Sequence, residues 1–169
     1  DPQIDSIDSA IQGFAELCDL AASHEQQVCL EFLPWSAVPD LRTAWQIVEA
    51  AERSNGGLVL DTWHWQRQPG GPDLELLSRI PGERIQHVQL CDASAEPLGH
   101  SMAEAISARL LPGAGVVDIR SVVATLVDIG ADPFVGAEVF NSELAARGPA
   151  AMARAVREAC SAVLSPSAA

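Results

Sequence analysis

The chain has 169 residues, of which 48% are hydrophobic and 20% are charged, a composition typical of a folded domain rather than a disordered segment. Its net charge at pH 7 is −13, and only 10 residues are Lys or Arg. Binding to nucleic acid or to an anionic membrane surface depends on clustered basic side chains, so both kinds of partner are disfavoured. No apolar run is long enough to span a bilayer.

The four cysteines are widely spaced and form no CxxC pair: Cys18, Cys29, Cys91 and Cys160. Isolated thiols in or beside apolar segments are typical of free cysteines in a reducing compartment, whereas a disulfide framework is denser in a short chain. We therefore predict a cytoplasmic protein. The chain begins at Asp1 without an initiator Met, and we interpret it as a processed, trimmed or incomplete product.

Apolar side chains recur at helical spacing over residues 5–24, which predicts a first helix. Four apolar runs of strand length come next, at residues 27–35, 57–65, 85–93 and 133–140. Each is followed by a helical segment, at residues 41–53, 74–80, 118–130 and 142–164. A longer irregular stretch covers residues 92–117, and residues 165–169 are predicted to be a frayed tail.

The predicted strands are continuous apolar runs, as expected for strands that are covered on both faces. Strands that alternate with helices form a parallel sheet with right-handed crossovers. We therefore predict one α/β domain over residues 1–169. This pattern fits a doubly wound sheet and a (β/α) barrel equally well, so the residues at the strand ends must distinguish them.

Each predicted strand carries a potential metal ligand near its C-terminal end: Glu31, Asp61, His87 and Glu138. A carboxylate buried alone is costly, so such groups are normally paired or metal-bound. The carboxyl ends of parallel strands are also where ligands collect. Singly, Asp61 is explained as a helix cap and His87 as a core histidine, but their joint occurrence favours one shared site. This mixed oxygen and nitrogen set suits Mn²⁺, Mg²⁺, Co²⁺ or Zn²⁺.

The segments LEFLPW, LDTWHW, IQHVQLCDA, RLLPGAG and GAEVF resemble, in order and spacing, the xylose-isomerase-like superfamily of sugar phosphate isomerases and epimerases. The resemblance runs from about residue 10 to residue 164 and corresponds to the second half of the family's fold. It implies a parallel TIM barrel that binds one divalent metal ion, with Mn²⁺ expected. This chain would supply a half barrel of four βα units preceded by a helix.

The resemblance also assigns roles to single residues. It implies metal ligands at Glu31, Asp61, His87 and Glu138, proton exchange with substrate by the two glutamates, and substrate contacts from His64 and Arg109. Related dehydratases often place Gln at the position given to His87, which favours an isomerase or epimerase. Ala114 replaces an acidic residue that is common in the family's PGEG stretch, so a contact from that position is not expected.

Three tryptophans lie beside the predicted ligands in sequence. Trp35 is predicted to form an aromatic wall against the apolar face of a sugar or cyclitol, although filling of the core is an alternative. For Trp63 and Trp65 the core is the favoured interpretation. In an extended strand, both would share one face with Asp61, and His64 would lie on the other.

We therefore expect a metal-dependent isomerase or epimerase of a small sugar, sugar phosphate or cyclitol. It would remove a proton next to a carbonyl and pass through a metal-stabilised enediolate. The alternatives are a dehydratase of a cyclic keto-polyol such as inosose or dehydroshikimate, an abasic-site endonuclease, which the acidic charge disfavours, and an inactive barrel fragment. A half barrel leaves two unpaired strand edges, so we also expect a missing N-terminal half or self-association.

Overall fold

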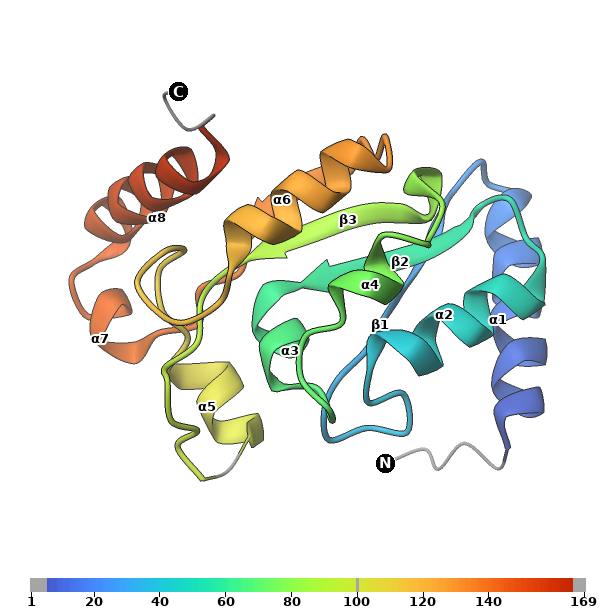
Figure 1. The fold of residues 1–169 in the computed structure, drawn as a ribbon, viewed down its shortest axis with the longest axis horizontal. Coiled ribbons are helices and arrows are strands. Elements are labelled where there is room, and N and C mark those ends of the chain that lie inside the picture. Colours follow the sequence, from blue (N-terminus) through green and yellow to red (C-terminus); the bar gives the residue numbers. More distant parts are fainter. Residues whose placement is uncertain (1–5, 100, 166–169) are drawn as a thin grey trace.

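The computed structural model describes residues 6–99 and 101–165. Its elements in chain order are α1 (Ile7–Ala22), β1 (Val28–Glu31), α2 (Leu41–Ala51), β2 (Gly56–Asp61), α3 (Thr62–Arg67), α4 (Leu74–Leu77), a 3₁₀ turn (Gly82–Arg84), β3 (Ile85–Leu90), α5 (Ser101–Ser107), α6 (Ile119–Asp128), β4 (Phe134–Ala137), α7 (Ser142–Ala145) and α8 (Pro149–Leu164). All neighbouring strands pair in parallel, in the order β1-β2-β3-β4 (Figure 1). The predicted parallel α/β arrangement is confirmed.

The two faces of this sheet differ in character. Leu58, Leu60, Val88 and Leu90 are at most 2% exposed and belong to the hydrophobic core. The opposite face carries the exposed Cys29 and Phe134, together with polar side chains. Among the described residues, no further strand pairs with the outer edge of β1 or of β4. The sheet is thus covered on one side and open on the other.

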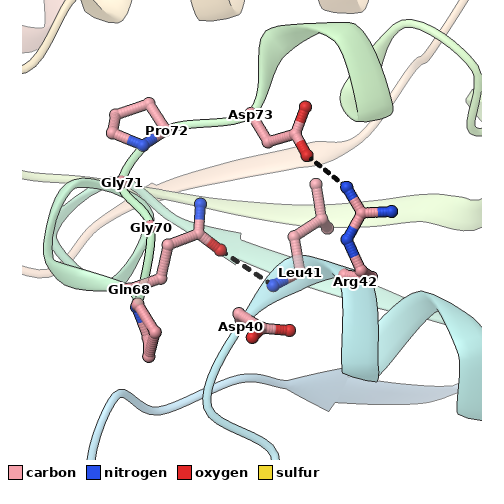
Figure 2. A pocket seen from close by; sticks show the side chains of 9 residues that line it. Asp40, Leu41, Arg42, Gln68, Gly70, Gly71, Pro72 and Asp73 are labelled. Atoms are coloured by element: carbon pink, nitrogen blue, oxygen red, sulfur yellow. Dashed lines mark hydrogen bonds and ion pairs between the residues drawn. The ribbon is translucent and has the colours of Figure 1, made fainter.

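Polar side chains define the ends of the helices around this sheet. Asp40 caps α2 by accepting a hydrogen bond from the Thr43 backbone N–H, and the Gln68 side chain accepts one from the Leu41 N–H. Figure 2 shows how the second bond connects the loop after α3 to the start of α2. An ion pair between Arg42 and Asp73 lies beside it. In Figure 1, α4 and α6 lie along the same side of the sheet, where they contact each other.

The predicted strand at residues 57–65 is wrong in its second half. The strand ends at Asp61, whose side chain accepts hydrogen bonds from the backbone N–H groups of Trp63 and His64 and so begins α3. The alternation of faces expected for Trp63, His64 and Trp65 therefore does not apply, because these residues are helical.

Two further element predictions also differ from the structure. The stretch predicted as irregular contains α5. The predicted terminal helix over 142–164 is broken into α7 and α8, because Gly148 adopts a φ of 86° and Pro149 then begins the next helix. Of the predicted frayed tail, only Ser165 lies within the described residues.

Candidate metal centre

Three of the predicted ligands meet at the carboxyl ends of the strands. Glu31 is the last residue of β1, Asp61 is the last residue of β2, and Glu138 directly follows β4, where its backbone N–H donates to the Leu90 carbonyl. One carboxylate oxygen of Glu31, one of Asp61 and one ring nitrogen of His64 lie within 4.8 Å of one another. Two of these residues, Glu31 and Asp61, are among the predicted metal ligands, whereas His64 was predicted to contact the substrate.

Asp61 both caps a helix and faces the site. Its side chain is fully buried, and its Oδ1 accepts hydrogen bonds from the backbone N–H groups of Trp63 and His64 at 2.8 and 2.9 Å. Its Oδ2 lies 2.6 Å from Nη1 of Arg109. The helix-cap interpretation of Asp61 is thus correct without excluding a ligand role, because the two oxygens serve different partners.

Glu31, Asp61 and Glu138 form an acidic cluster at the strand ends. Arg109 contacts two of these carboxylates, and its side chain is only 3% exposed. Its Nη1 contacts Asp61 Oδ2 at 2.6 Å and Glu138 Oε2 at 3.0 Å. Its Nε donates to the Ala105 carbonyl at 2.7 Å, and its Nη2 lies 3.3 Å from His64 Nε2. The structure therefore places this predicted substrate-binding residue between two of the predicted metal ligands.

The loop that follows Arg109 is held by the buried carboxylate of Asp92. This carboxylate accepts hydrogen bonds from the backbone N–H groups of Gly113, Gly115 and Val117 at 2.9 to 3.0 Å. The loop also approaches the segment after β3 closely, since a Cβ on Gly115 would lie 2.1 Å from the Ala93 carbonyl. Asp92 thus fixes the LPGAG segment, and with it the backbone that carries Arg109.

Burial and neighbouring charge give Glu31 and His64 unusual proton affinities. Burial, together with the charges of Asp61 and Glu138, raises the pKa of the Glu31 carboxyl to about 7. Burial lowers the pKa of His64 to about 4, so its imidazole is neutral at pH 7. His64 Nε2 lies 3.6 Å from Glu31 Oε1. A neutral imidazole beside a carboxyl that titrates near neutrality is suited to metal binding or to contact with a substrate hydroxyl.

Gln89 is a site residue that the sequence analysis missed. It pairs with Asp61 on one side and with Gly136 on the other, and its Nε2 donates to Glu138 Oε1 at 3.1 Å. Its Oε1 is buried and has no hydrogen-bond partner among the described residues. An amide oxygen is an accepted ligand for hard divalent cations. The Gln89 side chain thus contacts Glu138 through its nitrogen and keeps a buried oxygen that is available as a metal ligand.

His87 lies in a different row of the sheet. It pairs with Val59 and with Phe134, and its ring lies 5.6 Å from the Phe134 ring. β3 contains one extra residue opposite the step from Leu58 to Val59, and Asp61 therefore pairs with Gln89 rather than with Val88. The position between Asp61 and Glu138 therefore belongs to Gln89, and the structure does not bring His87 into it.

Aromatic side chains border the cluster on two sides. The half-buried Trp35 ring lies 5.3 Å from the His64 ring and 6.0 Å from the Trp63 ring. Trp63 and Trp65 are 0% and 2% exposed and belong to the core. Phe140, which is 47% exposed, lies 5.3 Å from the Arg109 guanidinium. Trp35 and Phe140 thus keep part of their aromatic surface exposed beside the cluster.

The thiol of Cys91 lies next to the cluster. Cys91 Sγ lies 3.8 Å from Asp61 Oδ1 and 3.4 Å from Arg109 Nη1. Burial raises the pKa of Cys91 to about 12, and the Asp61 charge acts in the same direction. The Cys91 thiol is therefore protonated at neutral pH in the metal-free protein.

The fold and the acidic cluster define a class: half of a parallel (β/α) barrel with ligand side chains at the carboxyl ends of its strands. The chain belongs to the xylose isomerase-like TIM barrel family, whose model matches residues 1–161. This match confirms the predicted family and fold class. Within the described residues, no helix is both long and apolar enough to cross a membrane.

Named relatives include enzymes of two kinds. The chain is 31% identical to the inosose isomerase of Bacillus subtilis (strain 168) over 137 residues, which are 80% of this chain and 48% of that protein. It is 32% identical to a 3-dehydroshikimate dehydratase of Pseudomonas aeruginosa over 128 residues, which are 75% of this chain and 20% of that protein. The chain thus spans about half the length of the isomerases that it matches.

A solved structure shares the fold and holds a metal ion. The IolI protein, crystallised with a bound zinc atom, superposes with a TM-score of 0.82 at 26% identity. The match covers 94% of this chain and 56% of that chain. The chain is thus similar to isomerases and to a protein that binds zinc. These similarities support an enzyme with a divalent metal site.

Proposed function

We propose that this chain forms the catalytic half of a divalent-metal-dependent isomerase or epimerase that acts on a keto-polyol, with an inosose as the substrate class. The observation that carries this proposal is the convergence of Glu31, Asp61 and Glu138 at the carboxyl edge of one parallel sheet. The similarity to inosose isomerases supports the substrate class. Free cysteines throughout the chain support a cytoplasmic location.

We assign the metal to Glu31, Asp61, Gln89 and Glu138. The donor chemistry fits, because three carboxylates and an amide oxygen suit Mn²⁺ and Mg²⁺, and Co²⁺ and Zn²⁺ are accepted by the same geometry. The unpartnered Oε1 of Gln89 is the atom that this assignment satisfies. Gln89 takes the role that the sequence analysis gave to His87. When bound, the metal would polarise the substrate's carbonyl and hydroxyl oxygens.

The two glutamates are placed to move the proton. Glu31 and Glu138 come from opposite edge strands of the sheet, and burial raises the pKa of both. A carboxylate with a pKa near neutrality is an efficient base at pH 7. In this proposal Glu31 and Glu138 exchange protons with the carbon next to the carbonyl from the two faces of the substrate. His64 and Trp35 contact the substrate beside Glu31.

A dehydratase of a cyclic keto-polyol is the second candidate. The family resemblance associates a Gln ligand with dehydratases, and the chain is 32% identical to a 3-dehydroshikimate dehydratase over 128 residues. Dehydration begins with the same proton removal and then expels a hydroxyl group from the next carbon. The acidic cluster serves both reactions, so the product distinguishes them.

The described strands enclose the proposed metal site on one side, so further strands must complete the enclosure. A complete barrel needs eight strands, and the described sheet has open edges at β1 and β4. We propose that an N-terminal half of the same protein, or else a second copy, closes the barrel. If neither of them closes the barrel, we expect the chain to be an inactive fragment.

The test is a solvent-exchange experiment on the full-length protein loaded with Mn²⁺ and incubated with an inosose in D₂O. Isomerisation or epimerisation gives a product of the same formula that carries deuterium, whereas dehydration gives a product that lacks one water. Mass spectrometry separates the two. The metal-loaded protein with Glu138→Gln serves as the control that should show no exchange. Absence of exchange and of water loss in the unmodified protein would reject the proposal.

A further inference from the structure

The Arg109 guanidinium contacts carboxylate oxygens of Asp61 and Glu138, both of which belong to the proposed metal site. Asp61 Oδ1 is already committed to the backbone N–H groups of Trp63 and His64, so Oδ2 is the oxygen that Asp61 has left for a metal. Arg109 Nη1 lies 2.6 Å from this Oδ2 and 3.0 Å from Glu138 Oε2. One nitrogen thus bridges the same pair of carboxylates that the proposed metal would bridge.

The charges explain why a cation is required there at all. Asp61 Oδ2 and Glu138 Oε2 both lie within 3.0 Å of Arg109 Nη1, so two carboxylates share this one cationic group. A buried carboxylate without a partner is strongly destabilising. Arg109 therefore supplies the compensating charge in the metal-free arrangement.

We propose that Arg109 is a built-in counter-cation, which neutralises Asp61 and Glu138 without metal and leaves Asp61 Oδ2 when a divalent metal binds. This inference rests on the metal site proposed above. The guanidinium has a short route outward, because it already lies 5.3 Å from the ring of Phe140, which is 47% exposed.

The displacement links metal loading to substrate binding. While Arg109 bridges Asp61 and Glu138, its Nη1 donors are used within the protein. Once released, the same N–H groups face the pocket and contact the substrate, the role that the family resemblance gives to this arginine. Arg109 also lowers the apparent metal affinity, because only the fraction of molecules with the guanidinium withdrawn is competent to bind.

Calorimetry of Mn²⁺ binding to the full-length protein tests the competition. Arg109→Gln is expected to bind Mn²⁺ at least about tenfold more tightly than the unmodified protein, because the competing cation is gone. Arg53→Gln removes the same charge from a residue paired with the exposed Asp19 and should leave the affinity unchanged. Equal or weaker binding by Arg109→Gln would overturn the inference.

A second measurement needs no substitution that might unfold the protein. In the arginine-labelled, unmodified protein, the guanidinium protons of Arg109 should exchange slowly with water without metal, because the group is buried and bridged. Saturation with Zn²⁺ should accelerate this exchange at least about tenfold as the population shifts to the withdrawn state. Unchanged exchange with metal bound overturns this inference alone. Failure of the unmodified protein and of Arg109→Gln to bind any metal overturns the proposed function as well.

Discussion

Gln89 lies directly beside Asp61 in the parallel register of β2 and β3, and its amide nitrogen donates to Glu138 at 3.1 Å. One neutral side chain therefore stands next to Asp61 in the sheet and contacts Glu138, and its own oxygen is buried without a hydrogen-bond partner among the described residues. A divalent cation would satisfy that oxygen and both carboxylates together.

This relationship predicts unequal effects of substitutions on β3. Gln89→Leu, which keeps the volume but removes the amide oxygen, should weaken Mn²⁺ binding at least about tenfold. His87→Leu should change it by less than about threefold, because His87 pairs with Val59 and Phe134. Calorimetric titration of both variants measures this difference. The reverse order of effects would restore His87 as the ligand.

Glu138→Gln should separate catalysis from metal binding. The amide keeps an oxygen for the metal but cannot accept a proton, so turnover should fall below detection while most of the bound metal is retained. Turnover and metal content measured on the same preparation test this expectation. Glu143→Gln, on the exposed surface of α7, is the matched control. Unchanged turnover in Glu138→Gln would remove the assignment of this residue to proton transfer.

The raised pKa of Glu31 predicts how the metal-free protein responds to pH. Its pKa of about 7 in the folded state lies above the ordinary value of 4.5, so the folded state binds the proton more tightly than the unfolded state. The stabilisation from Glu31 is therefore present at low pH and declines as the pH rises from about 4.5 to about 7.

Glu31→Gln should reduce this decline. Urea unfolding of the metal-free protein at several pH values in that window measures the slope of the unfolding free energy. Asp61, Glu138, Arg109 and His64 face Glu31 and remain in the variant. A slope that is identical in the variant and in the unmodified protein would show that Glu31 titrates normally.

The buried ion pair between Arg67 and Glu104 predicts a stability effect away from the metal ligands. Its atoms lie 2.7 Å apart, and the two side chains are 10% and 1% exposed. Breaking such a pair from one side leaves an uncompensated charge, so Arg67→Gln should cost about 3–5 kcal/mol of unfolding free energy. Arg42→Gln breaks the exposed pair with Asp73 and should cost less than about 1 kcal/mol. Chemical denaturation that gives equal losses for both variants would contradict this account.

Much of the fold could be predicted from the sequence because its signals are local. Four apolar runs separated by helical segments specify a parallel sheet, and glutamate is disfavoured inside buried strands. Glu31 and Glu138 therefore stood out as functional residues. Asp61 taken alone is explained as a helix cap, and its cap bonds to Trp63 and His64 indeed turn the following residues from strand to helix.

The fourth ligand position depends on information that is not local. In IQHVQL, His87 carries the stronger chemical signal and Gln89 reads as an ordinary strand residue. The pairing register of β2 and β3 decides that Gln89 and not His87 stands beside Asp61, and the register between two strands leaves no mark in either strand alone. Helix α5 was missed because it lies in a stretch of weak periodicity, and its buried Glu104 is stabilised by the distant Arg67.

The most direct test of the metal assignment is a crystal structure of the full-length protein with Mn²⁺, with an anomalous difference map to locate the metal. We expect one anomalous peak, with Glu31, Asp61, Gln89 and Glu138 as its ligands and with the Arg109 guanidinium withdrawn from Asp61. A peak at other residues, or none at these four under saturating Mn²⁺, would contradict it.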